Sequence, residues 1–330
     1  QAVVRGKWPL LPCGCVGGVA RGSRAQGSQE RVRTESLLVS EIHQPVPGTI
    51  TTLREIAQQF WPVGVLSFAV ALVATPICRR IALAKGIVDK PDNFLKPHER
   101  PIPYLGGVAI FLGWVTGLVV ATALGLNVRP SFMVGVGVAG LAIMLTGLFD
   151  DLRVMSPTTK LACNFAVAIL LIGLGLGDHL IRVVTDFMHV EFSPGERWLE
   201  LTYSLPVALL IIIGACNATN LIDGLDGLCS GVLGIISVGF FALAVHLRLY
   251  SDIEVNNERI VLSLAMLGAA AGFLPFNTNP AKIFMGDAGS MLLGLNAAIL
   301  ILLFGEVRLV RWMIGALMVF GLPIAAMALT

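Results

Sequence analysis

Long apolar segments alternate with short polar segments from about residue 60 to the end of the chain. A helix needs about 20 mostly apolar residues to cross a lipid bilayer. Segments of about this kind occupy 61–81, 103–125, 131–149, 159–176, 203–216, 229–249, 260–276, 289–305 and 312–330. The pattern therefore predicts an all-α, polytopic integral membrane protein with about nine transmembrane helices.

The two ends of the chain depart from this pattern. Residues 1–59 are rich in Gly, Ser, Arg and Gln and show no sustained hydrophobic period, which predicts a disordered or poorly structured N-terminal extension. The multi-helix membrane domain is then 60–330. Its last apolar segment runs to Thr330 without the polar or aromatic flank that usually anchors a span. We therefore expect the domain to be C-terminally incomplete, cut before its last helices.

Composition supports the membrane class. The chain is 55% hydrophobic and 13% charged, whereas soluble domains carry about 25% charged residues. The formal net charge of +2 gives no strong field for gathering nucleic acid, so no nucleic-acid partner is expected. The six cysteines show no metal-ligand spacing, and four of them lie in or beside apolar runs, as buried thiols do.

Basic residues set the predicted orientation. The loop after the first span, 79–100, is rich in Lys and Arg, which places it in the cytoplasm. Alternation of the spans then places 150–158, 217–228 and 277–288 on the same side. The unusual polar clusters of the chain all fall in these loops, so we expect them on the cytoplasmic face.

The first cluster is the acidic pair Asp150-Asp151. The pair follows the C-terminal end of a span, where the helix dipole disfavours negative charge, and Ser156 is the better N-cap for the next span. Paired carboxylates at a membrane edge can hold a divalent cation, or one can act as a base. The alternative is an ordinary solvated loop.

Two further clusters combine polar side chains with glycines. Polar residues recur at every third position in 217–226, which places neighbouring members on a shared helical face; they are Asn217, Asn220, Asp223 and Asp226. The other cluster pairs Lys282, a cation suited to phosphate, with Asp287 at the start of a span. A glycine-rich turn and a simple N-cap are the respective alternatives.

The fourth cluster lies in the first cytoplasmic loop and contains Lys96, His98 and Arg100. A basic loop beside a bilayer is often only an orientation signal or a site for anionic lipid. The prolines and glycines that follow, up to Gly107, imply a loop of fixed shape.

The combined inventory is acidic groups for a metal, cations for phosphate and Asn for hydrogen bonding. Phosphoryl transfer between a soluble nucleotide and a lipid phosphate needs this mixture. No GxxxxGK motif is present, which argues against an ATP-driven pump. The runner-up is a proton- or sodium-coupled secondary transporter, whose acids would lie near the bilayer midplane; a catalytically inactive scaffold is a third hypothesis.

Four motifs together resemble the polyprenyl-phosphate N-acetylhexosamine-1-phosphate transferases. They are GLFDDL, NATNLIDGLDGL, PAKIFMGDAGS and the K-x-H-x-R-x-x-P-x-x-GG loop, and the resemblance runs from about residue 61 to the end. The chain is more similar to the bacterial undecaprenyl-phosphate N-acetylglucosamine-1-phosphate transferases than to phospho-N-acetylmuramoyl-pentapeptide transferase, which remains an alternative.

The resemblance implies transfer of a sugar 1-phosphate, N-acetylglucosamine 1-phosphate above all, from a UDP-sugar to undecaprenyl phosphate. UMP is released, Mg²⁺ (or Mn²⁺) is required, and the product starts a cell-envelope glycan such as teichoic acid or lipopolysaccharide. The implied location is the plasma (inner) membrane, with the active site on the cytoplasmic face. Members of such a family can form homodimers.

The resemblance also implies roles for individual residues. The catalytic residues are Asp150, Asp151 and Asp287, and the metal is held by Asp287, Asp151 and Asn220. The residues that bind substrate are Lys96, His98, Arg100, Asn217, Asn220, Asp223, Asp226 and Lys282. Among the catalytic residues, Asp150 would deprotonate or position the lipid phosphate.

Two departures from the family pattern put the activity of the chain as given in question. The family has a later cytoplasmic loop with a histidine-rich motif, and the sequence ends before reaching it. The carbohydrate branch also often has an aspartate where this chain has Ala326.

Overall fold

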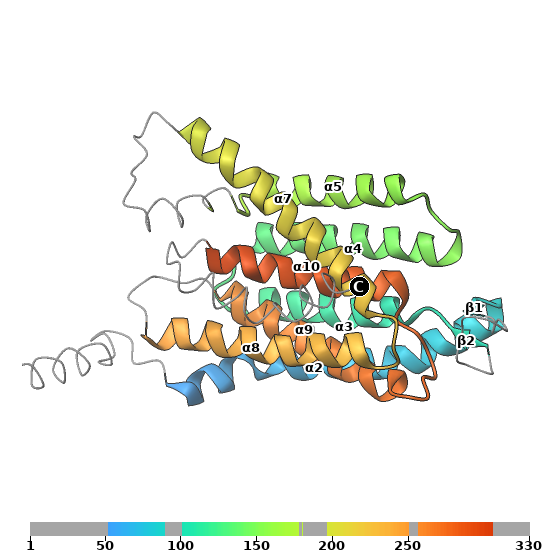
Figure 1. The fold of residues 1–330 in the computed structure, drawn as a ribbon. Coiled ribbons are helices and arrows are strands. Elements are labelled where there is room, and N and C mark those ends of the chain that lie inside the picture. Colours follow the sequence, from blue (N-terminus) through green and yellow to red (C-terminus); the bar gives the residue numbers. More distant parts are fainter. Residues whose placement is uncertain (1–51, 90–100, 178–179, 181–196, 251–256, 306–330) are drawn as a thin grey trace, which may run out of the picture. The chain divides into compact units, whose positions relative to one another are not determined.

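The computed structural model describes residues 52–89, 101–177, 180, 197–250 and 257–305. In this part of the chain the structure is a bundle of α-helices with one small β-hairpin (Figure 1). The helices are α2 (Leu53–Lys85), α3 (Gly106–Ala123), α4 (Pro130–Leu152), α5 (Pro157–Gly173), α7 (Arg197–Ile222), α8 (Leu228–Tyr250), α9 (Glu258–Asn277) and α10 (Gly286–Gly305). The hairpin pairs β1 (Val88–Asp89) with β2 (Ile102–Pro103) in antiparallel register, Val88 opposite Pro103.

The helices confirm the predicted all-α membrane fold. Each predicted span from 61–81 to 289–305 falls on one of them, and within the described ranges 7 helices are long and apolar enough to cross a membrane. The helix α5 is apolar but shorter, with 17 residues. The ninth predicted span, 312–330, lies outside the described residues.

The first helix begins earlier than the sequence pattern predicts. Thr52 and Glu55 form a capping box, in which Glu55 N donates to Thr52 Oγ1 (3.3 Å) and Thr52 N donates to Glu55 Oε2 (3.0 Å). Residues 53–59 are therefore helical, and the predicted domain boundary between 59 and 60 is wrong. At 33 residues, α2 is about 50 Å long, so its polar first turns extend past a hydrocarbon core of about 30 Å.

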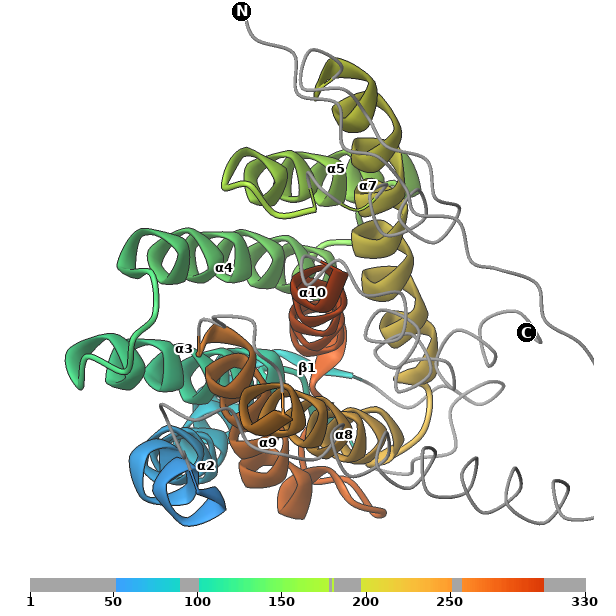
Figure 2. The same cartoon turned by 90° about the vertical axis from the view of Figure 1, so that its left-hand side faces the viewer.

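Helix α10 is the centre of the bundle. All of its residues from Ala288 to Gly305 are buried, and α3, α4, α7, α8 and α9 surround it (Figures 1 and 2). Glycines allow the closest approaches, because a Cβ on Gly107 or Gly147 would collide with the backbone of Ala288 or of Asp287. The N-terminus of α10 is thus held against α3 and α4.

At one end of the bundle an ion pair joins two helices, with its acid buried and its base, Arg129, 45% exposed. The Glu258 carboxylate, 2% exposed, accepts hydrogen bonds from the Arg129 guanidinium at 2.8 Å through both Nε and Nη2. Arg129 precedes α4 and Glu258 opens α9, so the pair joins two helices at the end of the bundle away from the hairpin.

The other end contains the polar clusters. Helices α2, α4, α7 and α9 end there, and α3, α5, α8 and α10 begin there, on the right in Figure 1 beside the hairpin. The acidic pair, the 217–226 cluster and the 280–290 cluster therefore meet at one end of the bundle. This confirms that motifs distant in sequence share one face.

Candidate active site

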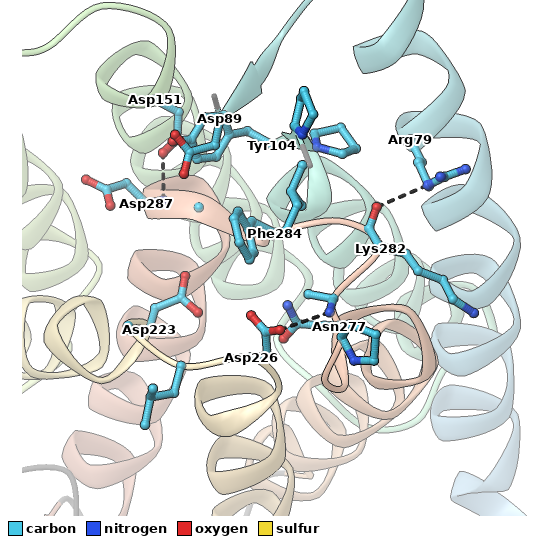
Figure 3. A pocket seen from close by; sticks show the side chains of 18 of the residues that line it. Arg79, Asp89, Tyr104, Asp151, Asp223, Asp226, Asn277, Lys282, Phe284 and Asp287 are labelled. Carbon is cyan, nitrogen blue, oxygen red and sulfur yellow. Dashed lines mark hydrogen bonds between the residues drawn. The ribbon is translucent and has the colours of Figure 1, made fainter. Parts of the chain in front are cut away.

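A pocket of about 1220 Å³ opens at this end of the bundle (Figure 3). Its lining contains six carboxylates and two basic side chains, drawn from segments across the chain. The carboxylates are those of Asp89, Asp150, Asp151, Asp223, Asp226 and Asp287, and the basic residues are Arg79 and Lys282. Six of the predicted site residues are among these lining groups, and Asn220 is a seventh.

Asp151 caps the N-terminus of α10, although it belongs to the last turn of α4. Its Oδ1 accepts a hydrogen bond from Asp287 N (2.9 Å) and its Oδ2 from Ala288 N (3.3 Å). Gly286 has φ +65°, and a Cβ there would collide with the Asp151 carboxylate. The negative charge at the positive end of the α10 dipole is favourable, so Asp151 fixes the position of Asp287.

The neighbouring carboxylate of Asp150 has different partners. Its Oδ1 accepts from Met155 N (2.7 Å) and its Oδ2 from the Lys160 ammonium (2.9 Å). Lys160 also binds Oδ2 of Asp287, so one cation bridges carboxylates of α4 and α10. The Lys160 and Asp150 side chains are 17% and 14% exposed.

Lys160 is a site residue that the sequence analysis missed. The available signal was a single lysine in the first turn of an apolar segment, ten residues after Asp150. The predicted N-cap of this helix is confirmed, because Ser156 Oγ accepts from Thr159 N (3.2 Å). This cap places Lys160 one turn into α5, facing the acidic pair.

Asn220 completes the surroundings of Asp287 from the last turn of α7. Its Nδ2 donates to Asp287 Oδ1 (2.6 Å) and to Ser290 Oγ (3.2 Å). Asn217, one turn earlier, donates to the carbonyl of Ile213 in its own helix (2.8 Å) and is not among the lining residues. The structure thus brings Asn220, and not Asn217, to the pocket.

The two aspartates after α7 face the pocket in different ways. Asp226 accepts from Ala281 N (2.9 Å) and Asn279 Nδ2 (3.3 Å), which ties the α7–α8 loop to the α9–α10 loop. Burial, followed by the charges of Asp151, Asp287 and Asp226, raises the pKa of Asp223 well above its usual range. A nearby cation would therefore stabilise the ionised form of Asp223.

The loop before α10 is fastened to the start of α3. Phe284 N donates to Pro103 O (2.9 Å), while Gly106 N and Gly107 N donate to the carbonyls of Phe284 and Met285 (3.0 and 2.9 Å). The fixed shape predicted for the first cytoplasmic loop is thus present in its described part, 101–107. Three predicted substrate-binding residues of this loop, Lys96, His98 and Arg100, lie outside the described residues.

Lys282 lies at the rim of the pocket. Its carbonyl accepts a hydrogen bond from Arg79 Nε (3.0 Å), and its exposed side chain points away from Asp287 (Figure 3). Both basic residues of the lining are therefore some way from the acidic centre, where Lys160 is the cation.

Two aromatic residues also line the pocket and were not predicted. Tyr104 and Phe284 have ring centroids 6.2 Å apart. Burial, together with its hydrogen bond to Asp89, raises the pKa of the Tyr104 hydroxyl above its usual range. The sequence did offer one signal for Tyr104, which lies two residues before the Gly106-Gly107 pair of the K-x-H-x-R-x-x-P-x-x-GG motif.

The donor set suits a magnesium ion. Mg²⁺ is usually held by one or two carboxylates together with substrate phosphates and water. Asp150 and Asp287 already share the Lys160 ammonium. The Asn220 amide, whose Nδ2 donates to Asp287, also carries an oxygen that can bind a metal ion. No group of three His, Cys, Asp or Glu side chains converges on a metal position within the described residues.

Fold and site together define a polytopic membrane protein with an acidic pocket at the ends of its helices. The sequence pattern of glycosyl transferase family 4 matches residues 133–305, just over half of the 330 residues. The chain belongs to this family.

Several relatives share a large part of the chain. A probable undecaprenyl-phosphate N-acetylglucosaminyl 1-phosphate transferase of Bacillus subtilis is 36% identical over 79% of this chain and 67% of its own length. A decaprenyl-phosphate N-acetylglucosaminephosphotransferase of Mycobacterium tuberculosis is 34% identical over 76% of this chain, which spans only 61% of that relative. A phospho-N-acetylmuramoyl-pentapeptide-transferase of Halalkalibacterium halodurans is 31% identical over 74% of this chain and 75% of its own length.

These comparisons confirm the predicted family. They favour the enzyme hypothesis over the transporter, as does the position of the acids at helix ends rather than at the midplane of the bundle.

Proposed function

We propose that this protein transfers N-acetylglucosamine 1-phosphate from a UDP-sugar to undecaprenyl phosphate, releases UMP, and so starts an envelope glycan. The reaction takes place at the cytoplasmic face of the plasma membrane. The observation that supports it most is that carboxylates of α4 and α10 meet around one cation at the end of a membrane bundle. A water-soluble nucleotide and a lipid phosphate can meet only at such an end.

The transfer is a displacement at phosphorus. An oxygen of the lipid phosphate attacks the β-phosphorus of the UDP-sugar, and the bond from this phosphorus to the oxygen shared with UMP breaks. UMP takes the electron pair and leaves. Asp150 lies where it can orient the attacking phosphate or accept its proton, because it faces the pocket beside Lys160.

Magnesium, when bound, offsets charge on the transferred group and on the leaving UMP. In the described structure, Asp287 and Asp150 offer carboxylate oxygens for it and Asn220 an amide oxygen. Both carboxylate oxygens of Asp151 accept hydrogen bonds from backbone N–H groups of α10, so its proposed role is to hold Asp287 in place. This differs from the direct metal contact expected from the resemblance.

The other wall of the pocket suits the nucleotide. Tyr104 and Phe284 offer aromatic faces on which a uracil ring can stack. Asp223 lies on the same pocket surface as an acceptor for sugar or base hydroxyl and N–H groups.

The test is UMP release from the protein expressed from its complete reading frame in membranes. The assay contains undecaprenyl phosphate, Mg²⁺ and, in separate reactions, UDP-N-acetylglucosamine, UDP-N-acetylgalactosamine and UDP-N-acetylmuramoyl-pentapeptide. Asp150→Asn and Asp287→Asn should each lose more than about 100-fold in rate, as expected when a group acting on the transferred phosphate is removed. Glu55→Gln, a carboxylate-to-amide change in the first turn of α2, is the matched control and should keep full rate.

EDTA should abolish UMP release, and added Mg²⁺ or Mn²⁺ should restore it. Release with the pentapeptide nucleotide alone would assign the protein to the peptidoglycan reaction instead. A folded protein that releases no UMP from any of the three nucleotides would refute the transferase proposal.

A further inference from the structure

The inner face of α5 carries two polar residues among apolar ones. The buried positions of this helix are Asn164, Val167, Ala168 and Leu171, and half-buried Lys160 continues their spacing toward the N-terminus as one stripe. The stripe faces α4 and α7, the helices against which α5 packs. Lys160 and Asn164 are the only polar members of this stripe, four residues apart.

Lys160 occupies the place that a divalent cation would need. Its ammonium binds Oδ2 of Asp150 and Oδ2 of Asp287 at the same time. A metal ion that took these two oxygens would have to displace the ammonium, since both cations cannot use them. Lys160 therefore needs a second acceptor when the site is loaded.

Asn164 has an amide that lacks any partner among the described residues. Its side chain is 1% exposed, and neither Oδ1 nor Nδ2 makes a hydrogen bond. Ser67 and Arg248 each leave one atom unbonded, whereas Asn164 leaves two. A buried amide without partners is costly, so such groups are normally satisfied in some state of the protein.

The two residues are placed to meet. Side chains at i and i+4 of a helix lie one above the other, with Cβ atoms about 5–6 Å apart. Because helical side chains lean toward the N-terminus, the Asn164 amide lies over the turn that carries Lys160. Four methylene groups let the ammonium reach either the carboxylates or this amide.

We propose that Asn164 is a positioning residue for Lys160. Lys160 bridges Asp150 and Asp287 while no divalent cation is bound, and it turns to Oδ1 of Asn164 when a divalent cation takes the carboxylates. The inference rests on the proposed function only in that a divalent cation binds at these carboxylates. It predicts an energetic coupling between Lys160 and metal binding that passes through Asn164.

The experiment measures Mn²⁺ affinity by electron paramagnetic resonance on purified protein in detergent, without nucleotide or lipid phosphate. Lys160→Met removes the competing cation and should bind Mn²⁺ at least tenfold more tightly than wild type. Asn164→Leu, similar in size, removes the second acceptor and should bind Mn²⁺ about tenfold more weakly, in line with the loss of one hydrogen bond to a charged group. In the Lys160→Met background, Asn164→Leu should have no further effect.

Two further variants separate this role from a general packing defect. Asn164→Gln restores an amide on the same face and should return Mn²⁺ affinity toward wild type. Val167→Ala, on the same stripe of α5, should leave Mn²⁺ affinity unchanged. Thermal unfolding of each variant shows that it is folded, and Asn164→Ala replaces Asn164→Leu if the latter is not.

Equal affinity in wild type and Asn164→Leu would overturn the proposal, as would a weakening that persists in the Lys160→Met background. Undetectable Mn²⁺ binding by wild-type protein would also overturn it. Because the measurement needs no turnover, a protein that binds Mn²⁺ with the expected coupling but releases no UMP would refute only the proposed function.

Discussion

The adjacent aspartates Asp150 and Asp151 should differ sharply in their effect on stability. Asp151 accepts two backbone hydrogen bonds at the N-terminus of α10, whereas Asp150 accepts one backbone hydrogen bond and one from Lys160. In Asp151→Asn, the new NH₂ group faces a backbone N–H, so one hydrogen bond is lost and a buried donor remains unpaired. In Asp150→Asn, the Met155 N–H keeps its acceptor.

The magnitude follows from these contacts. An unpaired buried donor costs about 1–3 kcal/mol, and loss of the negative charge at the helix N-terminus adds roughly 0.3–1 kcal/mol. Asp151→Asn should therefore lose about 1–4 kcal/mol of stability, which lowers Tm by about 3–16 °C when each kcal/mol shifts Tm by about 2–4 °C. Asp150→Asn should stay within about 1 kcal/mol of wild type, because the loss of its bond to Lys160 is offset by weaker repulsion from Asp287.

The assay is thermal unfolding of the purified proteins in detergent without divalent cation, followed by UMP release at a temperature where each is folded. Both variants should be impaired in transfer, but only Asp151→Asn should be clearly less stable. Equal Tm values for the two variants would contradict the assignment of Asp151 as the cap of α10. A larger loss for Asp150→Asn would do so as well.

Three further predictions follow from other contacts. Gly286→Ala places a Cβ against the Asp151 carboxylate at a backbone with φ +65°. The same two assays should show a lower Tm and a rate of UMP release that is at least tenfold lower. Arg129→Met removes the ion-pair partner of the buried Glu258 carboxylate, which keeps its hydrogen bond from the backbone N–H of residue 129, and should cost about 1–3 kcal/mol in thermal unfolding. The KM for the UDP-sugar should not change, because the pair lies at the other end of the bundle. The pKa of Asp223 is raised, so between about pH 4 and that raised pKa the folded state binds more protons than the unfolded state. The metal-free protein should therefore lose stability as pH rises through this window. Unfolding curves at a series of pH values should show a weaker dependence of stability on pH for Asp223→Asn than for wild type.

Much of the fold was predictable because the signal for a membrane helix is composition over about 20 residues, and only helices and closed β-barrels satisfy their backbone hydrogen bonds in lipid. The start of α2 was missed because its first turns are polar and extend past the apolar stretch. The capping box of Thr52 and Glu55 was nevertheless present in the sequence.

The site was predictable where a residue type is rare for its position, as with acids at the ends of spans. The partners of these acids were not, because they depend on contacts between helices. Nothing local to Asp151 indicates that it caps α10, and Asp226 and Asn217 have equivalent spacing although only Asp226 faces the pocket. The roles of Lys96, His98 and Arg100, and any homodimer, stay predictions.

The charge balance of the pocket links these observations. Among the described residues six carboxylates line it against two basic residues, Arg79 and Lys282, so these groups alone present net negative charge to a diphosphate. Asp151 is compensated by the α10 N-terminus, while Asp150 and Asp287 share Lys160. In the part of the chain that the structure describes, the centre of the pocket has one cation for two carboxylates, and a ligand with several phosphate charges requires more. In the exchange that we propose, a divalent cation takes the place of Lys160 and adds two positive charges while Lys160 stays nearby. Three positive charges at the centre would let this acidic pocket bind the two phosphorylated substrates of the proposed reaction at once.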